Sequence, residues 1–415
     1  MELVLVLDCG ANAQLLARRV REWNVYSEIV PGDMTWSELC VRQPQGIIVC
    51  GDSKTVDPQL LQGDIPVLLT ESLSTEELHT TEGKRVIEEF VKHECGCKGD
   101  WNMESFIERS IAQIRAQVGH SQVVCGLSGG IDSSVAAVLV HKAIGDQLTC
   151  IYVDHGLMRL GETEQVINTF EKQFQMRLIH VDARKRFLTK LEDVEDPEEK
   201  RKIIGTEFIR VFEEEAQKIG DAQFLVQGTL YPDVVESGTD QSAVVKSHHN
   251  VGGLPEDLQF SLVEPLKELF KDEVRKLAQV LELPDEIIWR HPFPGPGLAI
   301  RIMGAITQEK IDILQAADAI AIEEIKKAGL YRDIWQALVV LTNTRTVGVL
   351  HGQRTYDYVV ALRFVSSEDG MSADWSRIPY DVLARISNRL LHEVNGINRV
   401  VYDISSKPPA TIEWE

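Results

Sequence analysis

The sequence has 415 residues, 44% of them hydrophobic and 26% charged, a composition typical of a globular protein with two or three folded domains. Its formal net charge of −21 disfavours broad binding to nucleic acid or to anionic membranes, because phosphate-rich partners require a basic surface. The chain shows no apolar run as long as a membrane span and no signal peptide, and its seven Cys are scattered. We therefore expect reduced thiols and a cytoplasmic location.

The first region, 1–94, alternates short apolar strands with helices, which is typical of a small α/β unit. The predicted strands are 3–7, 46–50 and 66–70, and the predicted helices are 13–23 and 84–92. A Cys- and Gly-rich segment at 95–101 follows. Cys95, Cys97 and the nearby His93 are too few for a structural zinc site, so we interpret this segment as a joint between domains.

The middle region, 95–290, opens with an amphipathic helix at 103–118, in which Phe and Ile recur at helical spacing. Strands then alternate with helices. The predicted strands are 123–127, 149–153, 177–181 and 224–227. This alternation predicts a doubly wound parallel sheet with right-handed crossovers.

The last region, 291–415, begins at a Pro- and Gly-rich cluster between His291 and Gly297 and mixes helices with strands. Helices are predicted at 308–328 and 380–394, and strands at 337–341, 356–364 and 399–404. The predicted fold class is therefore α/β: a doubly wound parallel-sheet domain, preceded by a smaller α/β unit and followed by an α+β domain.

The strongest local signal is the string Ser-Gly-Gly-Ile-Asp-Ser-Ser at 128–134, between a predicted strand and an apolar helix. The glycines let backbone N–H groups converge and the helix N-terminus adds partial positive charge, so the segment suits an anion. Because it lacks the Gly-Lys-Ser/Thr end of a Walker A motif, we expect it to hold a leaving pyrophosphate. For a bare Gly-Gly pair the alternative is a simple helix cap. The predicted ligands of ATP are Ser128, Gly129, Gly130, Asp132, Ser133 and Ser134, with Val153 and Gly228 at the ends of later strands.

Two carboxylates point to magnesium in the same site. Asp132 alone would repel phosphate, so its position implies an intervening Mg²⁺, and Asp233 in a turn after the strand at 224–227 is the second predicted ligand. Taken alone, Asp233 is equally well explained as a turn residue after Pro. Glu236 lies three positions further on and is a candidate catalytic residue. The expected co-substrate of the site is ATP.

These features resemble the signature of the N-type ATP pyrophosphatases, which adenylate a carbonyl oxygen and release pyrophosphate. Residues 95–415 further resemble the synthetase part of GMP synthetases along essentially their whole length. The matching strings lie at 96–101, 197–205, 246–254, 291–301 and 406–415. The resemblance implies three domains, at 1–94, 95–290 and 291–415. It also implies a reaction in which XMP, ATP and ammonia give GMP, AMP and pyrophosphate through an adenyl-XMP intermediate.

The same resemblance implies roles for individual residues. Arg201 and Lys407 are expected to hold the XMP phosphate, with Arg301 close by. Glu413 and Gln336 are expected to contact the nucleoside. Thr411 is a further candidate in the XMP site.

Three residues at 246–249 are expected to form part of a catalytic lid over the reacting phosphates, namely Lys246, His248 and His249. Without the resemblance, this His pair is better explained as an exposed polar loop or a metal-binding patch. The last domain is expected to complete the XMP site and to form a homodimer.

The N-terminal region resembles only the start of a class I glutamine amidotransferase domain, at 5–8, 16–22 and 28–31. Such a domain needs a nucleophilic Cys on a sharp turn after a strand, and a His and a Glu later in the chain. Here the strand at 66–70 runs into Glu71 and Ser72 without a Cys, and the resemblance resumes at 79–84, beyond the place of the His and Glu. We expect no glutaminase activity, which leaves free ammonia or a separate glutaminase subunit as nitrogen source.

Two alternatives remain open: an enzyme that uses another purine-like acceptor, and a nucleotide-binding regulator without activity. The retained site residues argue against both. The shortened N-terminal region must expose sheet edges or apolar faces, so we also predict a contact there. One departure from the family pattern lies at 350–354, where a Gly-Asp pair is expected before Arg354.

Overall fold

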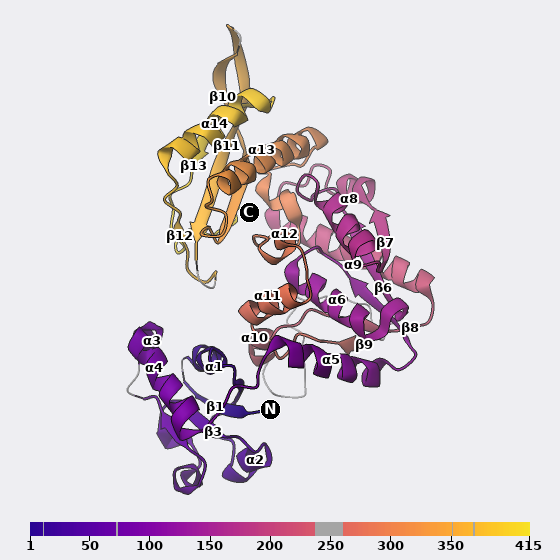
Figure 1. The fold of residues 1–415 in the computed structure, drawn as a ribbon. Coiled ribbons are helices and arrows are strands. Elements are labelled where there is room, and N and C mark those ends of the chain that lie inside the picture. The colour runs from indigo at the N-terminus through magenta and orange to yellow at the C-terminus, as the bar shows by residue number, and fades with distance from the viewer. Residues whose placement is uncertain (11, 72–73, 237–259, 351, 368–369) are drawn as a thin grey trace. The chain divides into compact units, whose positions relative to one another are not determined.

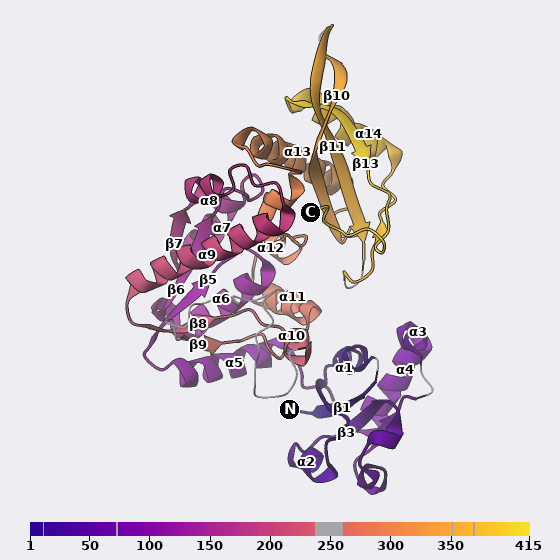
Figure 2. The same ribbon diagram turned by 180° about the vertical axis from the view of Figure 1, so that it is seen from behind.

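The computed structural model describes residues 1–10, 12–71, 74–236, 260–350, 352–367 and 370–415, which form two compact units (Figure 1, Figure 2). The first unit combines Met1–Ala116 with Gly228–His248 and Glu264–Val280. The second combines Gln117–Gln227, His249–Val263 and Leu281–Glu415. The predicted lid residues Lys246, His248 and His249 lie outside the described residues. Our three-domain division remains a prediction.

The first unit contains a parallel sheet of order β2-β1-β3-β4. Its strands are β1 (Leu3–Cys9), β2 (Tyr26–Pro31), β3 (Gly46–Gly51) and β4 (Val67–Leu69). Side chains alternate between two apolar clusters, with Val4 and Val6 of β1 in one and Leu5 and Leu7 in the other, because successive residues of a strand face opposite sides. The predicted strand at the start of the chain is therefore confirmed as buried.

The first unit also contains helices. They are α1 (Ala13–Arg21), α2 (Trp36–Val41), α3 (Thr75–His79), α4 (Thr81–Glu89), α5 (Met103–Val118), α10 (Tyr231–Glu236) and α11 (Lys271–Val280). Helix α4 continues into a π-helical turn at Phe90–Glu94, so the helix predicted at 84–92 begins earlier and ends later. The strand β2 and the helix α11 were not predicted.

A buried arginine ties parts of the first unit that are distant in sequence. The Arg21 guanidinium lies 2.8 Å from the Glu273 carboxylate and 4.5 to 5.2 Å from the ring centroids of four aromatic residues, Tyr26, Trp101, Tyr231 and Phe270. Tyr231 and Phe270 also belong to the same apolar cluster as Val4 and Val6. Part of the apolar surface that we expected the shortened region to expose is thus covered within the chain; the predicted contact with a partner remains a prediction.

The second unit contains a five-stranded parallel sheet of order β7-β6-β5-β8-β9, the doubly wound arrangement that was predicted. Its strands are β5 (Gln122–Gly126), β6 (Leu148–Asp154), β7 (Arg177–Asp182), β8 (Ala222–Val226) and β9 (Ser261–Val263). The accompanying helices are α6 (Ile131–Ile144), α7 (Glu162–Ile167), α8 (Arg184–Lys190), α9 (Pro197–Ile219) and α12 (Asp285–Ile288). Strand β9 is a short edge strand that the sequence did not predict.

The acidic stretch before α9 sets the start of that helix. Asp196 is its N-cap and accepts a hydrogen bond of 2.8 Å from the Glu199 N–H, while Pro197 occupies the first turn. Helix α6, in contrast, is apolar on all sides and almost entirely buried, because it packs against the sheet.

A mainly antiparallel sheet follows within the same unit. Its strands are β10 (Gln336–Leu350), β11 (Gln353–Ser366), β12 (Asp374–Trp375) and β13 (Ile397–Tyr402), and its helices are α13 (Gln308–Lys327) and α14 (Tyr380–Glu393). Strand β13 pairs with β11 in parallel. The strands β10 and β11 form a hairpin much longer than the two predicted strands, and it projects from the sheet in Figure 1.

One apolar core joins the two sheets of the second unit. Val124 and Ile151 of the parallel sheet belong to the same cluster of buried residues as Leu341 and Phe364 of the second sheet. At the chain end Ile412 is buried, whereas Trp414 is 37% exposed. The long C-terminal part is therefore fixed to the parallel-sheet part by a shared core.

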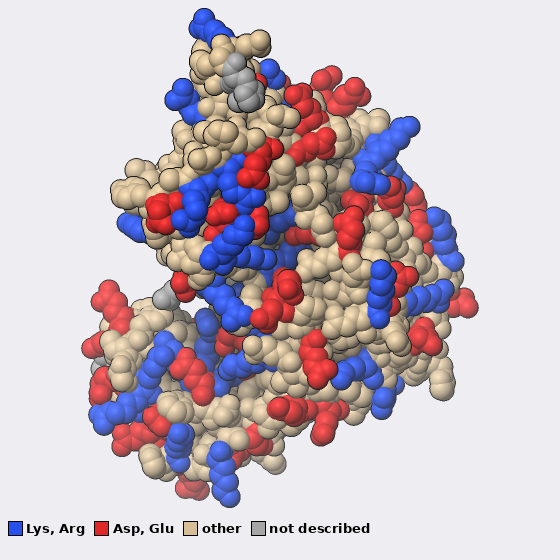
Figure 3. Space-filling view, turned by 45° about the horizontal axis from the view of Figure 1, so that its top comes forward, with Lys and Arg blue, Asp and Glu red and all other residues tan. Residues whose placement is uncertain are grey.

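Acidic and basic side chains are interspersed on the face shown in Figure 3. Among the described helices, none is long and apolar enough to span a bilayer.

Candidate functional site

The loop after β5 is held in a tight turn by two serines. The hydroxyl oxygens of Ser128 and Ser133 lie 2.9 Å apart, and the Gly130 N–H donates to Ser128 Oγ at 3.3 Å. Gly129 has φ +73°, a conformation that favours glycine. Gly130 is the N-cap of α6 and no side chain caps that helix, so its first N–H groups are directed at the loop. This geometry suits an anion, as predicted.

The loop residues differ in exposure. Ser128 is exposed, and Asp132 and Ser133 are half-buried. Ser134 is fully buried, and its hydroxyl has no hydrogen-bond partner within the described part of the chain. Ser128 and Ser133 are therefore the predicted hydroxyl ligands that lie nearest to solvent, and direct contact of Ser134 with a phosphate remains a prediction.

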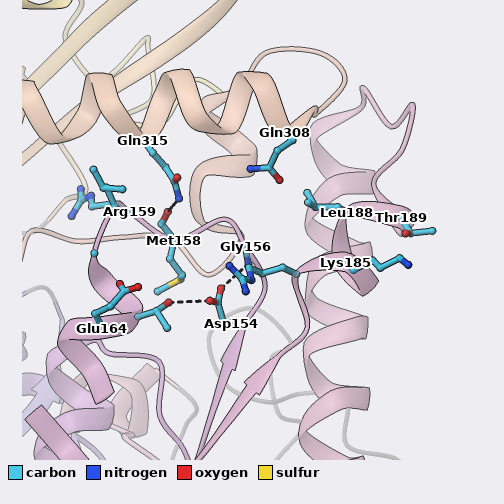
Figure 4. A pocket seen from close by; sticks show the side chains of 14 residues that line it. Asp154, Gly156, Met158, Arg159, Glu164, Lys185, Leu188, Thr189, Gln308 and Gln315 are labelled. Atoms are coloured by element: carbon cyan, nitrogen blue, oxygen red, sulfur yellow. Dashed lines mark hydrogen bonds between the residues drawn. The ribbon is translucent and has the colours of Figure 1, made fainter. Parts of the chain in front are cut away.

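A cavity of about 620 Å³ lies at the carboxyl ends of β6 and β7 (Figure 4). At its base the buried Asp154 carboxylate accepts hydrogen bonds from the Gly156 N–H at 2.8 Å and from the Thr163 hydroxyl at 3.1 Å. Val153, the predicted ATP contact, precedes Asp154 and is buried. The cavity has the size of a small-molecule site, and it lies at the end of β6, the strand that contains the predicted ATP ligand Val153.

The predicted acceptor residues come together on the C-terminal part of the second unit. Arg301 is fully buried and donates two hydrogen bonds to the Glu413 carboxylate, at 3.0 and 2.8 Å. The Gln336 amide donates to the same carboxylate at 2.7 Å. Residues separated by 77 to 112 positions in sequence therefore form one hydrogen-bonded group. This group places Arg301 with the two residues expected at the nucleoside, and the XMP contacts themselves remain predictions.

The remaining predicted acceptor residues have separate partners. Arg201 donates to the Glu415 carbonyl and lies 3.2 Å from the Glu198 carboxylate. The Lys407 ammonium donates to the Gly370 carbonyl at 2.7 Å, and the Thr411 hydroxyl donates to the Glu413 carbonyl. A shared phosphate ligand for Arg201 and Lys407 thus remains a prediction.

A buried lysine that the sequence did not single out holds the chain end. Lys200 is fully buried and donates to the Glu415 carboxylate and to the Ile302 carbonyl, the latter at 2.8 Å. Burial is the main cause that lowers the pKa of Lys200, and the Glu415 carboxylate opposes this effect. The pair fixes a residue only two positions from Glu413.

Replacing Glu415 by Gln should lower the free energy of unfolding by about 1–3 kcal/mol, because a charged acceptor of a buried ammonium becomes neutral. Chemical denaturation of both proteins measures this difference. Glu309→Gln, which changes an exposed carboxylate of α13, is the matched control and should change stability by less than about 0.5 kcal/mol. Equal stabilities for the Glu415 variant and the original protein would contradict the importance of this pair.

The other predicted catalytic residues lie in the first unit. The Leu230 N–H donates to the Asp233 carboxylate at 2.9 Å, and the Thr229 hydroxyl donates to Glu264 at 2.6 Å. Gly228 begins this segment, and the Glu236 side chain is outside the described structure. Asp132 belongs to the second unit, so a Mg²⁺ shared by Asp132 and Asp233 remains a prediction.

The turn after β4 and the thiols of Cys50 and Cys95 do not suit a glutaminase nucleophile. Strand β4 is followed by Thr70 and Glu71, and no Cys occurs at this turn. Burial raises the pKa of the Cys50 thiol to about 11 and of the Cys95 thiol to about 12. A nucleophilic Cys requires a lowered pKa, so these thiols are protonated and unsuited to that role.

The doubly wound sheet and its Ser-Gly-Gly loop define the class of ATP pyrophosphatases that activate an acceptor by adenylation. In agreement, residues 102–205 match the family model NAD synthase, and residues 323–414 match the model GMP synthase C terminal domain.

The chain belongs to the GMP synthase family. It is 49% identical over 505 residues to the "GMP synthase [glutamine-hydrolyzing]" of Carboxydothermus hydrogenoformans, with 99% of each chain covered. It is 56% identical over 382 residues to the protein of that name from Symbiobacterium thermophilum, covering 92% of this chain and 74% of the relative. A third such protein, from Geobacillus kaustophilus, is 47% identical over 507 residues and is 99% covered. Because the alignments of 505 and 507 residues exceed the length of this chain, these two relatives contain segments that it lacks.

Proposed function

We propose that this protein catalyses the ATP-dependent amination of XMP to GMP and releases AMP and pyrophosphate. Membership in the GMP synthase family supports this proposal. The observation that carries it is that one structural unit contains both the anion-binding loop at 128–134 and the group of Arg301, Gln336 and Glu413. The first suits the leaving pyrophosphate and the second suits a purine nucleotide.

The proposed chemistry explains why the protein needs both the anion-binding loop and the group of Arg301, Gln336 and Glu413. The oxygen at C2 of xanthine is a poor leaving group, and its attack on the α-phosphate of ATP converts it to a good one. Ammonia then displaces AMP. The loop and the N-terminus of α6 stabilise the charge of pyrophosphate as it leaves, and the Glu413 carboxylate orients the acceptor through the acceptor's N–H groups.

Mg²⁺ is the metal that this reaction requires in our proposal. Within the described residues no group of three or more His, Cys, Asp or Glu suits a metal. Mg²⁺ in nucleotide sites binds one or two carboxylates together with phosphates and water, so it needs no larger cluster, and we propose Asp132 and Asp233 as its carboxylate ligands. Bound there, Mg²⁺ would neutralise phosphate charge.

The nitrogen source follows from the shortened N-terminal region. Because this region lacks the nucleophilic Cys and its partners, we propose that the protein uses free ammonia or ammonia from a separate glutaminase subunit. We also propose a homodimer formed through the C-terminal sheet, and a cytoplasmic location. The hairpin of β10 and β11 exposes Val349 and Tyr356, which supports an apolar contact there.

Pyrophosphate release with ATP, Mg²⁺ and XMP tests the proposal directly. With ammonium as nitrogen source we expect GMP and pyrophosphate in equal amounts, and with glutamine alone we expect neither. Removal of Mg²⁺ by a chelator should stop both products. Turnover with glutamine alone would show that the N-terminal unit retains a glutaminase, and no turnover with ammonium would favour another acceptor or a regulatory role.

A further inference from the structure

An arginine outside the predicted site contacts the backbone of the anion-binding loop. Arg290 follows α12, and its Nη1 donates to the Gly129 carbonyl at 2.6 Å. Its Nη2 lies 2.8 Å from the Glu162 carboxylate of α7. The side chains of Arg290 and Glu162 are only 13% and 10% exposed. This buried pair lies against the loop on the side of the Gly129 carbonyl.

Both partners of this pair are fixed by further contacts. The Glu162 carboxylate also accepts a hydrogen bond of 3.2 Å from the Arg159 N–H. The Arg290 guanidinium lies 5.4 Å from the centroid of the Phe293 ring. Since Arg is planar and presents two donors in a rigid fork, it can bind a carbonyl and a carboxylate at once without freedom to rotate.

The contact determines the direction of one peptide group. A peptide bond is planar and trans, so the Gly129 carbonyl and the Gly130 N–H point in opposite directions. With the carbonyl turned to Arg290, the N–H is turned to Ser128 Oγ, 3.3 Å away, on the side where the two serine hydroxyls gather. The N–H therefore faces the side of the loop that suits an anion.

The same peptide group joins two glycines, and this makes its direction easy to reverse. Neither residue has a Cβ that would resist rotation about the flanking bonds, and Gly129 already has φ +73°. A reversed peptide would direct a carbonyl oxygen to the anion side and remove a donor there. The loop sequence alone does not prevent this reversal, so another group must.

We propose that Arg290 is a positioning residue that, together with Glu162, keeps the Gly129–Gly130 peptide directed so that its N–H group faces the pyrophosphate. The inference rests on the proposed function, since it assigns the loop to pyrophosphate. It concerns the loop half of the site, so binding of the acceptor nucleotide is independent of it.

The test is the binding of magnesium pyrophosphate, measured by titration calorimetry on the full chain. Arg290→Met should weaken this binding roughly 10- to 100-fold, because a donor is replaced by a repelling carbonyl. Arg290→Lys should recover part of the loss, because an ammonium can donate to the Gly129 carbonyl but does not reproduce the fork. Glu162→Gln should give a smaller loss in the same direction. Arg332→Met, which removes a 58% exposed arginine paired with Asp285, is the matched control.

Binding of a second ligand, XMP, distinguishes a loss of loop positioning from a general loss of structure. Binding of XMP by the Arg290 variants should stay within about twofold of the original protein, because positioning acts only on the loop. Equal loss for both ligands, or undiminished pyrophosphate binding by Arg290→Met, would overturn the inference. If Arg290→Met does not fold, the same comparison of pyrophosphate binding with XMP binding is made with Arg290→Lys and Glu162→Gln. Failure of the original protein to bind pyrophosphate would instead overturn the loop assignment in the proposed function, and the inference with it.

Discussion

Replacement of Arg301 by Met is expected to lower the free energy of unfolding by about 3–5 kcal/mol and to abolish measurable XMP binding. Arg301 is fully buried, donates twice to Glu413 and lies 3.8 Å from the buried Asp318 carboxylate. Without the guanidinium, the largely buried Glu413 carboxylate has lost its charged partner, whereas Asp318 keeps its ion pair with Arg159 at 3.1 Å. Such an uncompensated buried charge is among the most costly single changes in a protein.

Urea denaturation and titration with XMP measure the two effects. The exposed arginine variant Arg332→Met should lose less than about 1 kcal/mol, because exposed ion pairs contribute little. The double variant Arg301→Met with Glu413→Leu should be more stable than Arg301→Met, since the Glu413 carboxylate is gone, yet it should not bind XMP. Unchanged XMP binding in Arg301→Met would refute the assignment of this group to the acceptor.

The second large effect is expected for Gly129→Ala, which should reduce the rate of pyrophosphate release about 100-fold. A Cβ at this position would lie 2.9 Å from Val166 Cγ2 and 3.0 Å from Arg290 Nη1, and φ +73° is itself unfavourable for Ala. The loop must then move away from α7 and from Arg290. A displacement of this kind places the loop N–H groups out of register with the phosphates.

Gly145→Ala is the matched control for this prediction. Gly145 is the C-cap of α6, the helix that follows the loop, and it also has a positive φ, of +55°. A Cβ at Gly145 would meet no atom within 4 Å. Gly145→Ala should lower stability by about 1 kcal/mol and leave pyrophosphate release unchanged. The steady-state rate with ATP, XMP and ammonium distinguishes the two variants. Equal rates in the two variants would argue that the position of the loop is unimportant.

Local patterns in the sequence were sufficient for the doubly wound sheet and for the loop. Strands such as β5 and β6 are continuous apolar runs bounded by polar or glycine residues, and the helix at 103–118 has helical periodicity along its whole length. The string at 128–134 contains its own turn chemistry, and the hydroxyl oxygens of Ser128 and Ser133 lie 2.9 Å apart. Their predicted contact with phosphate remains a prediction. These features depend on residues close together in the chain.

Short or edge elements were harder to predict. Strand β9 has three residues and strand β2 is interrupted by Ser27 and Glu28, so neither carries a strong periodic signal. The hairpin of β10 and β11 is longer than predicted because its outer half is exposed and mixes polar residues with Val349 and Tyr356, and pairing between the strands stabilises it. In each of these cases, strand formation depends on a partner strand that a local pattern does not show.

The sequence by itself determined the family resemblance, the anion-binding loop and the loss of the glutaminase nucleophile, because each is a property of short strings. Only the tertiary structure decided which charged groups are buried together. Arg290 reaches Gly129 across 161 positions, Arg301 reaches Glu413 across 112, and Arg21 reaches Glu273 across 252. A buried cation requires a specific acceptor at hydrogen-bond distance, and which acceptor it finds depends on the packing of distant elements, so a local pattern gives no indication of the pair.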